Sequence, residues 1–298
     1  MKIEIRNLCK SFGENKSLNN VSFVIEGGQA FGILGRNGAG KTTFIRILLG
    51  IMNGDSGEIL IDGKDIRKEK VKFGYLPEER GLYLKYKVCD QLLYFAELNG
   101  INKKDAKKLI KEQLKLFKIE DYYNKKIEEL SKGNKQKVQL IAAIIHNPDV
   151  VVLDEPFSGL DPVNVELFKD ILKKLLKEKK TIIFSSHQMD SVEEFCNNVI
   201  LLKKGTIKLK GSIDDIKKKF SENKIKLLVD KDIDELIQML PLKISEKKDL
   251  NYFIKYKDKE DVNKLIHLIT EKNILIEDLT YIVPTLNEIF IDELGDEN

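Results

Sequence analysis

Proline is scarce in this sequence, with 6 residues in 298, and glycine is limited to 19. Hydrophobic residues make up 42% and charged residues 33% of the chain. This composition excludes a disordered or collagen-like chain and is typical of a folded globular protein. The length is about twice that of a usual domain, which allows a large domain and a smaller one.

Cysteine is also scarce. The three residues, Cys9, Cys89 and Cys196, are odd in number and widely spaced. That arrangement fits neither a disulfide framework nor a cysteine metal site. We expect three reduced thiols that are buried or half-buried.

Long apolar runs are absent from the sequence. Segments such as 140–145 and 150–153 fall far below the roughly 18 to 20 residues that span a bilayer. Residues 1–8 alternate charged and apolar side chains and lack the apolar core of a signal peptide. We therefore expect no transmembrane helix within this chain.

Charge is distributed unevenly along the chain. Residues 213–298 contain 14 Lys and 20 Asp or Glu, a net charge of −6, whereas residues 1–212 carry 37 basic and 28 acidic side chains, a net charge of +9. The opposite net charges suggest two domains, at residues 1–212 and 213–298. A basic first part favours a polyanion such as a nucleotide, nucleic acid or lipid head group, or simply reflects solvated lysines on helix faces.

Hydrophobic periodicity predicts alternating strands and helices in the first 212 residues. Half-buried strands alternate apolar and polar residues at 2–6, 21–25 and 57–61, and Lys204-Gly205 marks a turn into a further alternating strand. Continuously apolar segments, typical of buried strands, lie at 30–34, 150–153, 181–184 and 199–202. Helical spacing is found at 42–49, 86–117, 131–145, 162–178 and 188–195.

The last 86 residues follow a different order. The periodicity predicts strands at 224–229, 242–246, 251–257 and 273–282, with helices at 232–239 and 260–272. This βαββαβ order is the ferredoxin-like arrangement.

A glycine-rich segment lies between the apolar strand 30–34 and the helix that follows it. Residues 35–42 match GxxxxGK[ST] at every fixed position. Its glycines permit a loop whose N–H groups form an anion nest, Lys41 can reach the β- and γ-phosphates, and the Thr42 hydroxyl can bind Mg²⁺. The alternative is an ordinary glycine-rich turn. The candidate nucleotide-binding residues are Gly35, Arg36, Asn37, Gly38, Ala39, Gly40, Lys41, Thr42 and Thr43.

Two acidic residues end the apolar strand 150–153. Asp154 is suited to binding Mg²⁺, and Glu155 is suited to polarising a water that attacks the γ-phosphate. Two adjacent carboxylates at the edge of a buried strand would be costly without a cation. The alternative is a solvated acid pair in a loop.

Further segments resemble motifs of the ABC ATPase family. Residues 130–136, Leu-Ser-Lys-Gly-Asn-Lys-Gln, resemble its LSGGQ signature. Residues 158–161 resemble its D-loop, which contains Asp161, and residues 185–187 resemble its switch segment, which ends in His187. Together with the glycine-rich segment and the acidic strand, these motifs stand in the family's order within residues 2–212.

The resemblance implies an α/β P-loop NTPase fold with an N-terminal antiparallel β subdomain and a helical subdomain at about 86–147. The small α+β, ferredoxin-like domain at 213–298 would serve dimerisation or regulation. The resemblance also implies a head-to-tail dimer around two ATP molecules and Mg²⁺, with His187 at the γ-phosphate. In that dimer the signature completes the partner's site, through Ser131, Lys132, Gly133 and Asn134. Lys132 and Asn134 replace the usual glycine and glutamine, and we expect function to survive because backbone contacts dominate there.

Two more positions correspond to motif positions of the family but carry a different residue from the usual one. Phe12 occupies the aromatic position that stacks on adenine, where an ordinary turn phenylalanine is the alternative. Glu78, in the segment 74–80, occupies the position of the Q-loop glutamine. A glutamate keeps the oxygens and adds charge, so we expect Mg²⁺ binding to persist and to be stronger. The two other histidines, His146 and His267, are expected to be ordinary helix-face residues.

The resemblance implies an ATPase subunit that drives a separate transmembrane permease, as a homodimer or heterodimer, on the cytoplasmic face of the plasma membrane. The stretch 284–290 resembles the end of bacterial export-type cassettes with an extra C-terminal domain. A soluble ABC ATPase acting on ribosomes or DNA is the alternative. Such proteins carry two cassettes or a long coiled-coil insert, and only 113 residues separate Lys41 from Asp154, so we expect no nucleic-acid partner. A nucleotide-binding protein without hydrolysis is a further alternative, against which Glu155 argues.

Overall fold

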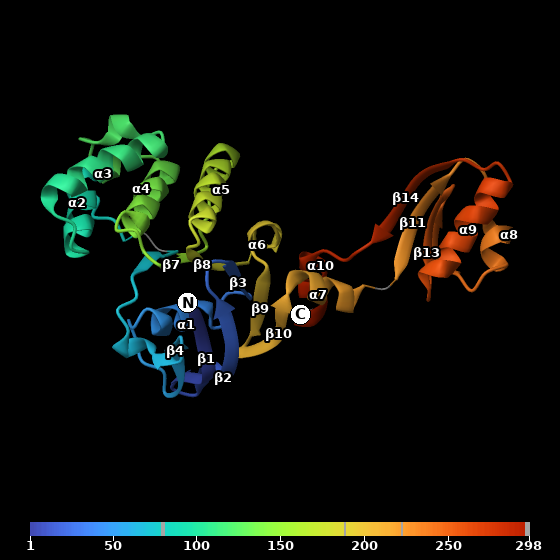
Figure 1. Cartoon of the computed structure of the whole chain (residues 1–298), viewed down its shortest axis with the longest axis horizontal. Helices are drawn as coiled ribbons and strands as arrows, with labels where there is room; N and C mark the ends of the chain where they lie inside the picture. Colours follow the sequence, from blue (N-terminus) through green and yellow to red (C-terminus); the bar gives the residue numbers. More distant parts are fainter. Residues whose placement is uncertain (79–80, 188, 222, 296–298) are drawn as a thin grey trace. The chain divides into compact units, whose positions relative to one another are not determined.

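The computed structural model describes residues 1–78, 81–187, 189–221 and 223–295. The chain divides into two compact units, Met1–Ile213 and Asp214–Asn298 (Figure 1). Among the described helices, none is both long enough and apolar enough to cross a membrane. The three cysteines are free thiols, of which Cys196 is buried and the others are half-buried.

The first unit begins with an antiparallel sheet of strand order β2-β1-β4-β5. Its strands are β1 (Lys2–Phe12), β2 (Asn15–Glu26), β4 (Ser56–Ile61) and β5 (Lys64–Asp65). Ile3 and Ile5 of β1 are buried on one face of this sheet, and Glu4 between them is only half-buried. The strands are longer than the alternating segments predicted from the sequence because polar residues continue the pairing of β1 with β2.

A second sheet has the order β10-β9-β3-β8-β7-β6, and its pairs are parallel from β9 to β6. Its strands are β3 (Ala30–Leu34), β6 (Phe73–Leu76), β7 (Val150–Asp154), β8 (Thr181–Ser186), β9 (Asn198–Lys203) and β10 (Thr206–Ser212). Every residue of β3, β7 and β8 is buried, as expected for parallel strands covered on both faces. The carboxyl ends of β3, β7 and β8 therefore lie together at one edge of the sheet.

The helices of the first unit follow the predicted segments closely. They are α1 (Lys41–Leu48), α2 (Val88–Leu98), α3 (Lys103–Leu116), α4 (Lys132–Ile144), α5 (Pro162–Lys177) and α6 (Met189–Phe195), with short 3₁₀ helices at Ile66–Lys68, Glu120–Tyr122 and Ile127–Glu129. Asn102, Ser131 and Asp161 cap α3, α4 and α5 with their side chains. The segment 86–117 forms two helices, because the stretch 99–102 ends α2 and begins α3.

The prediction for His146 was wrong. It lies beyond the end of α4, is buried, and its Nε2 lies 3.0 Å from the carbonyl oxygen of Phe73. Burial lowers the pKa of this imidazole. His146 is therefore a core residue that links the end of α4 to β6.

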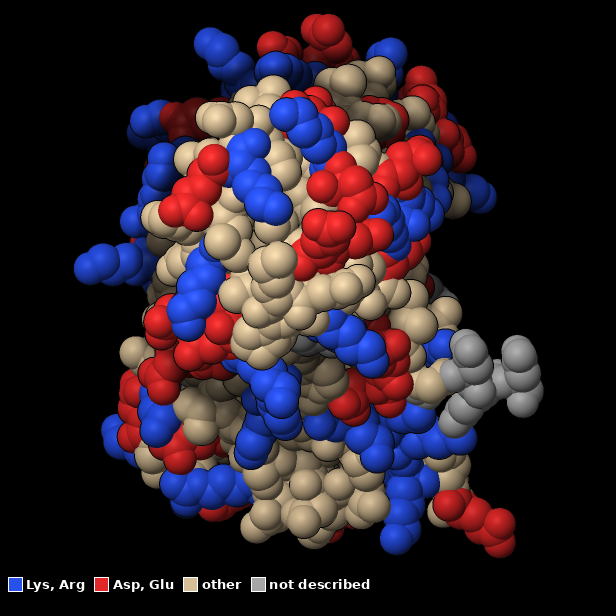
Figure 2. All heavy atoms as spheres, turned by 90° about the vertical axis from the view of Figure 1, so that its right-hand side faces the viewer, with Lys and Arg blue, Asp and Glu red and all other residues tan. Residues whose placement is uncertain are grey.

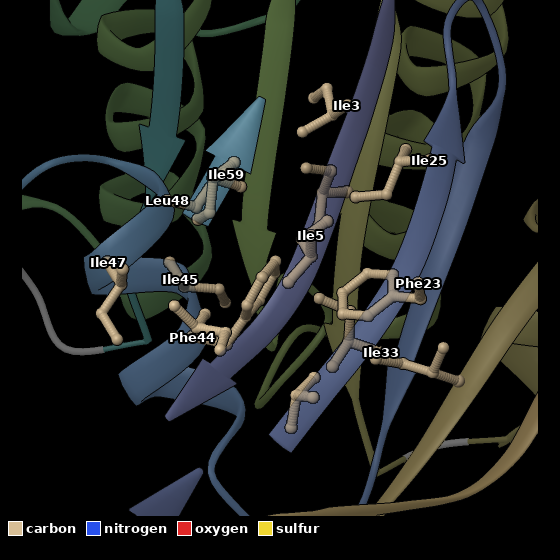
Figure 3. Packing of buried hydrophobic residues seen from close by; sticks show 14 of the residues in the cluster. Ile3, Ile5, Phe23, Ile25, Ile33, Phe44, Ile45, Ile47, Leu48 and Ile59 are labelled. Carbon is tan, nitrogen blue, oxygen red and sulfur yellow. The ribbon is translucent and has the colours of Figure 1, made fainter. Parts of the chain in front are cut away.

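The core of the first unit surrounds α1. Phe44 of α1 is fully buried, with its ring centroid 5.2 Å from that of Phe23, which stacks on Phe31 at 5.4 Å. Figure 3 shows Phe44 and its helix neighbours among Ile5 of β1 and Ile33 of β3. Because this cluster draws on both sheets, it holds the start of α1 at the end of β3.

The second unit contains a four-stranded antiparallel sheet of order β12-β13-β11-β14. Its elements follow the chain as β11 (Lys224–Val229), α8 (Asp234–Gln238), β12 (Lys243–Lys248), β13 (Asn251–Lys255), α9 (Lys259–Glu271) and β14 (Ile276–Ile282). This order and this pairing are ferredoxin-like, as the sequence predicts.

The second unit has its own core. Tyr252 is its largest fully buried side chain, and its hydroxyl accepts a hydrogen bond from the backbone of Ile233 at 3.1 Å. Figure 2 shows acidic and basic side chains interspersed over the face that it displays, without a single large acidic patch.

The described strands and α-helices that were not predicted from the sequence are β5, β6, α7 (Ile213–Phe220) and α10 (Leu286–Leu294). The three 3₁₀ helices were not predicted either. A signal for α10 was present, because Thr285 and Glu288 form a capping box at its start. The strand β6 has four residues, too few to establish a period.

Replacing Phe44 with alanine should destabilise the first unit by about 3–5 kcal/mol, because it leaves a cavity between the two sheets. Urea unfolding, followed by a probe in the first unit, measures this loss. Ile51→Ala is the control, since that side chain is 61% exposed, and it should cost less than about 0.5 kcal/mol. Equal losses in the two variants would contradict the described core.

Candidate functional site

The glycine-rich loop connects β3 directly to α1. Arg36, Asn37 and Gly38 are exposed at its tip, while Ala39 and Gly40 are buried. Gly40 has φ +108°, and a Cβ there would collide with the carbonyl oxygen of Ser17. Glycine is therefore required at this position for both conformation and space.

Lys41 is the first residue of α1, and it is only 6% exposed. Its Nζ donates a hydrogen bond to the carbonyl oxygen of Gly35 at 2.6 Å and lies 3.8 Å from Oε1 of Glu155. A buried ammonium at the start of a helix favours an anion beside it. Thr43 is anchored differently, with its Oγ1 2.8 Å from Oγ of Ser17 in β2.

Asp154 ends β7 and is 2% exposed. Thr42 donates a hydrogen bond to its Oδ2 at 3.3 Å, and Ser185 donates one to its Oδ1 at 2.6 Å. Burial raises the pKa of this carboxyl, the negative charge of Glu155 raises it further, and the two hydrogen bonds oppose the rise. A hydroxyl and a desolvated carboxylate form an oxygen donor set of the kind that Mg²⁺ prefers.

Glu155 follows Asp154 in the left-handed conformation, with φ +50°. Its N–H donates to the carbonyl oxygen of Ser185 at 2.9 Å. The carboxylate is 6% exposed, and Ser186 donates a hydrogen bond to Oε2 at 3.2 Å. His187, whose side chain is 53% exposed, lies with Nδ1 2.8 Å from Oε1. The carboxylate is therefore held at the edge of the sheet between Lys41 and His187.

Three serines in this cluster were not predicted as site residues. Ser185 and Ser186 end β8, which pairs in register with β7, so their hydroxyls face the two carboxylates. Ser17 holds Thr43 from β2. The signal for the first two was visible, because two hydroxyls at the end of a buried apolar strand need partners.

Glu78 follows β6, the strand next to β7, and its side chain is exposed. Burial raises the pKa of the nearby Tyr75 to about 12, and the negative charges of Asp154 and Glu78 contribute. Glu78 thus lies at the same edge of the sheet as Asp154. Residues 79 and 80, which complete the predicted Q-loop segment, lie outside the described residues.

The other predicted site residues stand apart from this cluster. Phe12 ends β1 with its ring half-exposed and the Nζ of Lys10 over it at 5.5 Å. Ser131 accepts a hydrogen bond from the N–H of Asn134 at 3.3 Å, and Lys132 is exposed in the first turn of α4. In the described part of the chain, no hydrogen bond or ion pair joins these residues to Lys41, Asp154 or Glu155.

Asp161 begins α5 and accepts hydrogen bonds from the N–H and the side-chain amide of Asn164. A Cβ on Gly133 would lie 2.8 Å from that same amide nitrogen. The first turns of α4 and α5 therefore contact each other through Gly133 and Asn164.

The cluster has the parts of a site that binds and cleaves a phosphoanhydride. The loop and Lys41 offer positive potential, Thr42 and Asp154 offer metal ligands, and Glu155 offers a carboxylate base whose partner is His187. All of them meet at the carboxyl edge of the parallel sheet, where open α/β sheets bind ligands.

Comparisons with known families agree with this geometry. Residues 18–158 match the model of the ABC transporter family. Residues 211–293 match the family described as the C-terminal domain of DrrA1-3-like ATP-binding proteins.

Individual relatives cover most of the chain. An uncharacterized ABC transporter ATP-binding protein of Bacillus subtilis, YhaQ, is 40% identical over 98% of this chain and 98% of its own length. A Nod factor export ATP-binding protein of Burkholderia lata is 36% identical over 68% of each chain. The dimeric, post-hydrolysis structure of the ATP-binding cassette MJ0796, bound to ADP and Pi, shares 25% identity and a TM-score of 0.64 over 71% of this chain and 98% of that one. The chain is an ATPase that belongs to the family of ABC transporter ATP-binding proteins.

Proposed function

We propose that the chain is the ATP-hydrolysing motor subunit of an ABC exporter, which dimerises around two ATP molecules and drives a separate membrane permease. The observation that carries the proposal is the placement of Glu155. This carboxylate is buried, held by Ser186 and His187, and 3.8 Å from the lysine of the phosphate loop. A base in that position can orient a water toward a γ-phosphate bound by the loop.

Nucleotide and metal would be held by residues already close to one another. Lys41 would exchange its bond to Gly35 for the phosphates, and the phosphate loop would supply N–H groups. Thr42 and Asp154 would hold Mg²⁺ together with Glu78, and the exposed ring of Phe12 would stack on the base. The metal would neutralise phosphate charge when bound.

The second half of each site would come from a partner chain. Ser131 stands at the start of α4, whose first turn contains no acidic residue, so this helix end keeps its positive potential for an anion. Within one chain this segment does not reach Lys41, which is consistent with action in trans together with Asp161. The relative MJ0796 is described as dimeric, which supports a dimer, either of this chain with itself or with a second ATPase subunit.

A permease would dock near the start of the helical segment. Apolar side chains are exposed on the stretch that leads into α2 and along α2 itself, at Tyr83, Leu84, Tyr86, Tyr94 and Leu98. Such a surface fits a partner helix. Docking there would place the chain on the cytoplasmic face of the plasma membrane.

Export is supported by the relative named for Nod factor export and by the stretch 284–290. The second unit, whose described residues hold no metal-binding cluster, would serve dimerisation or regulation.

Replacing Glu155 with glutamine should lower ATP hydrolysis about 10²- to 10⁴-fold and leave ATP binding intact, because only the base is removed. The closed dimer should then accumulate and elute as such in gel filtration with ATP and Mg²⁺. Lys41→Ala is the matched variant that should lose nucleotide binding itself. Elution of Glu155→Gln as a monomer under these conditions would count against the proposed dimer.

Replacing Asp154 with asparagine should stabilise the nucleotide-free protein at pH 7. The pKa of Asp154 is raised in the folded state, so its charge costs stability above that pKa, and the cost disappears as the pH falls through it. The difference in free energy of unfolding between Asp154→Asn and the wild type should therefore become smaller as the pH falls from 7 to 4. Urea unfolding of the first unit measures this difference. Asp170→Asn, at an exposed site, should change stability by less than about 0.5 kcal/mol at both values. A less stable Asp154→Asn protein at pH 7 would show that the charged carboxylate stabilises the fold instead of destabilising it.

Replacing Glu78 with glutamine should raise the Mg²⁺ concentration needed for half-maximal hydrolysis, since one negative charge is lost at the metal. Titrating Mg²⁺ at saturating ATP measures the change, with Glu97→Gln on the exposed side of α2 as the control. An unchanged Mg²⁺ dependence would show that Glu78 does not bind the metal.

A further inference from the structure

The loop that follows Glu155, residues 156–161, lies against the first two turns of α4. Gln136 in the second turn donates a hydrogen bond from its side-chain amide to the carbonyl oxygen of Pro156. Pro156 is the residue next to Glu155, so α4, which begins in the signature segment, holds the backbone beside the proposed base.

A second contact joins the same two segments. The side chain of Lys132 lies over Gly159, so closely that a Cβ on Gly159 would collide with Nζ and Cε. Gly159 has φ +70°, a conformation in which glycine is unstrained. The end of the Lys132 side chain thus occupies the space that a side chain at position 159 would need, beside the contact of Gly133 with Asn164.

The far side of the loop is fixed to the core of the first unit. Phe157 is buried, with its ring centroid 5.4 Å from that of Phe184 in β8 and 6.1 Å from that of Phe195 in α6. The N–H of Ser158 donates to the carbonyl oxygen of Glu155 at 3.1 Å. The loop is therefore clamped between the sheet on one side and α4 on the other.

Glu155 needs such restraints. A glutamate at φ +50° is in a sparsely populated, strained conformation that persists only when its surroundings hold it. A misplacement of about 1 Å at a reacting group is enough to cost a large factor in rate. The carbonyl oxygen of Pro156 belongs to the residue that follows Glu155. A hydrogen-bond donor at that oxygen therefore restrains the backbone conformation next to Glu155.

We infer that Gln136 is a positioning residue for hydrolysis, which transmits the placement of α4 to Glu155 through the carbonyl of Pro156. The inference rests on the proposed role of Glu155 as the base. Movement of α4 would then shift the base, so a chain whose signature helix is misplaced would bind ATP and hydrolyse it slowly.

The test replaces Gln136 with methionine, which keeps the length of the side chain and removes its N–H donors, and Gln136→Glu is the second variant. In the full-length protein, kcat for ATP should fall about 10- to 100-fold while KM stays within about twofold, because the phosphate loop is untouched. Hydrogen exchange of the Ser158 and Leu160 amides should become about tenfold faster. Gln139→Met is the control, because Gln139 lies on the same helix outside the signature, and within the described residues its buried side-chain amide nitrogen has no hydrogen-bond partner.

A folded Gln136 variant with wild-type kcat and unchanged exchange at Ser158 and Leu160 would overturn the inference. Equal effects in Gln139→Met would overturn it as well, because they would trace the loss to α4 in general. Glu155→Gln is assayed beside these variants. If it hydrolyses ATP at the wild-type rate, the proposed base is wrong, and the exchange rates still decide whether Gln136 holds the loop.

Discussion

The structure of the site depends on two carboxylates that are kept out of water at the end of a parallel strand. Asp154 and Glu155 are 2% and 6% exposed and adjacent in the chain. Removing one such charge from water costs several kcal/mol unless partners compensate. Here the compensation comes from Lys41, from Thr42 and from the hydroxyls that end β8. The proposed site would therefore receive a cation and a polyanion together.

The rest of the first unit supports this placement. The strands β3, β7 and β8 are parallel neighbours. The glycine-rich loop, the two carboxylates and His187 follow their carboxyl ends and therefore lie at the same edge of the sheet. The core around Phe44 packs α1 against both sheets. This packing fixes Lys41, the first residue of α1, beside Glu155 at the end of β7. Gln136 and Phe157 extend the same support to the loop that follows Glu155.

Much of this arrangement is predictable from the sequence, and the reasons are local. Fixed spacings identify the glycine-rich loop and Asp154, and apolar periodicity predicts β3, β7, α4 and the ferredoxin-like order of the second unit. Contacts between distant segments are not predictable in this way. The bond from Ser185 to Asp154 depends on the register of two strands, and the bond from Gln136 to Pro156 depends on how α4 packs. The prediction for His146 was wrong because its environment depends on β6, a strand that is distant in the sequence.

Calorimetric titration of a non-hydrolysable ATP analogue into the nucleotide-free protein, with and without Mg²⁺, tests whether the two buried carboxylates belong to a metal-nucleotide site. We expect saturable binding of one analogue molecule per chain, with tighter binding in the presence of Mg²⁺, because the buried carboxylate of Asp154 would share the cation with the phosphates. Absence of saturable binding, or binding that Mg²⁺ leaves unchanged, would contradict the proposed site.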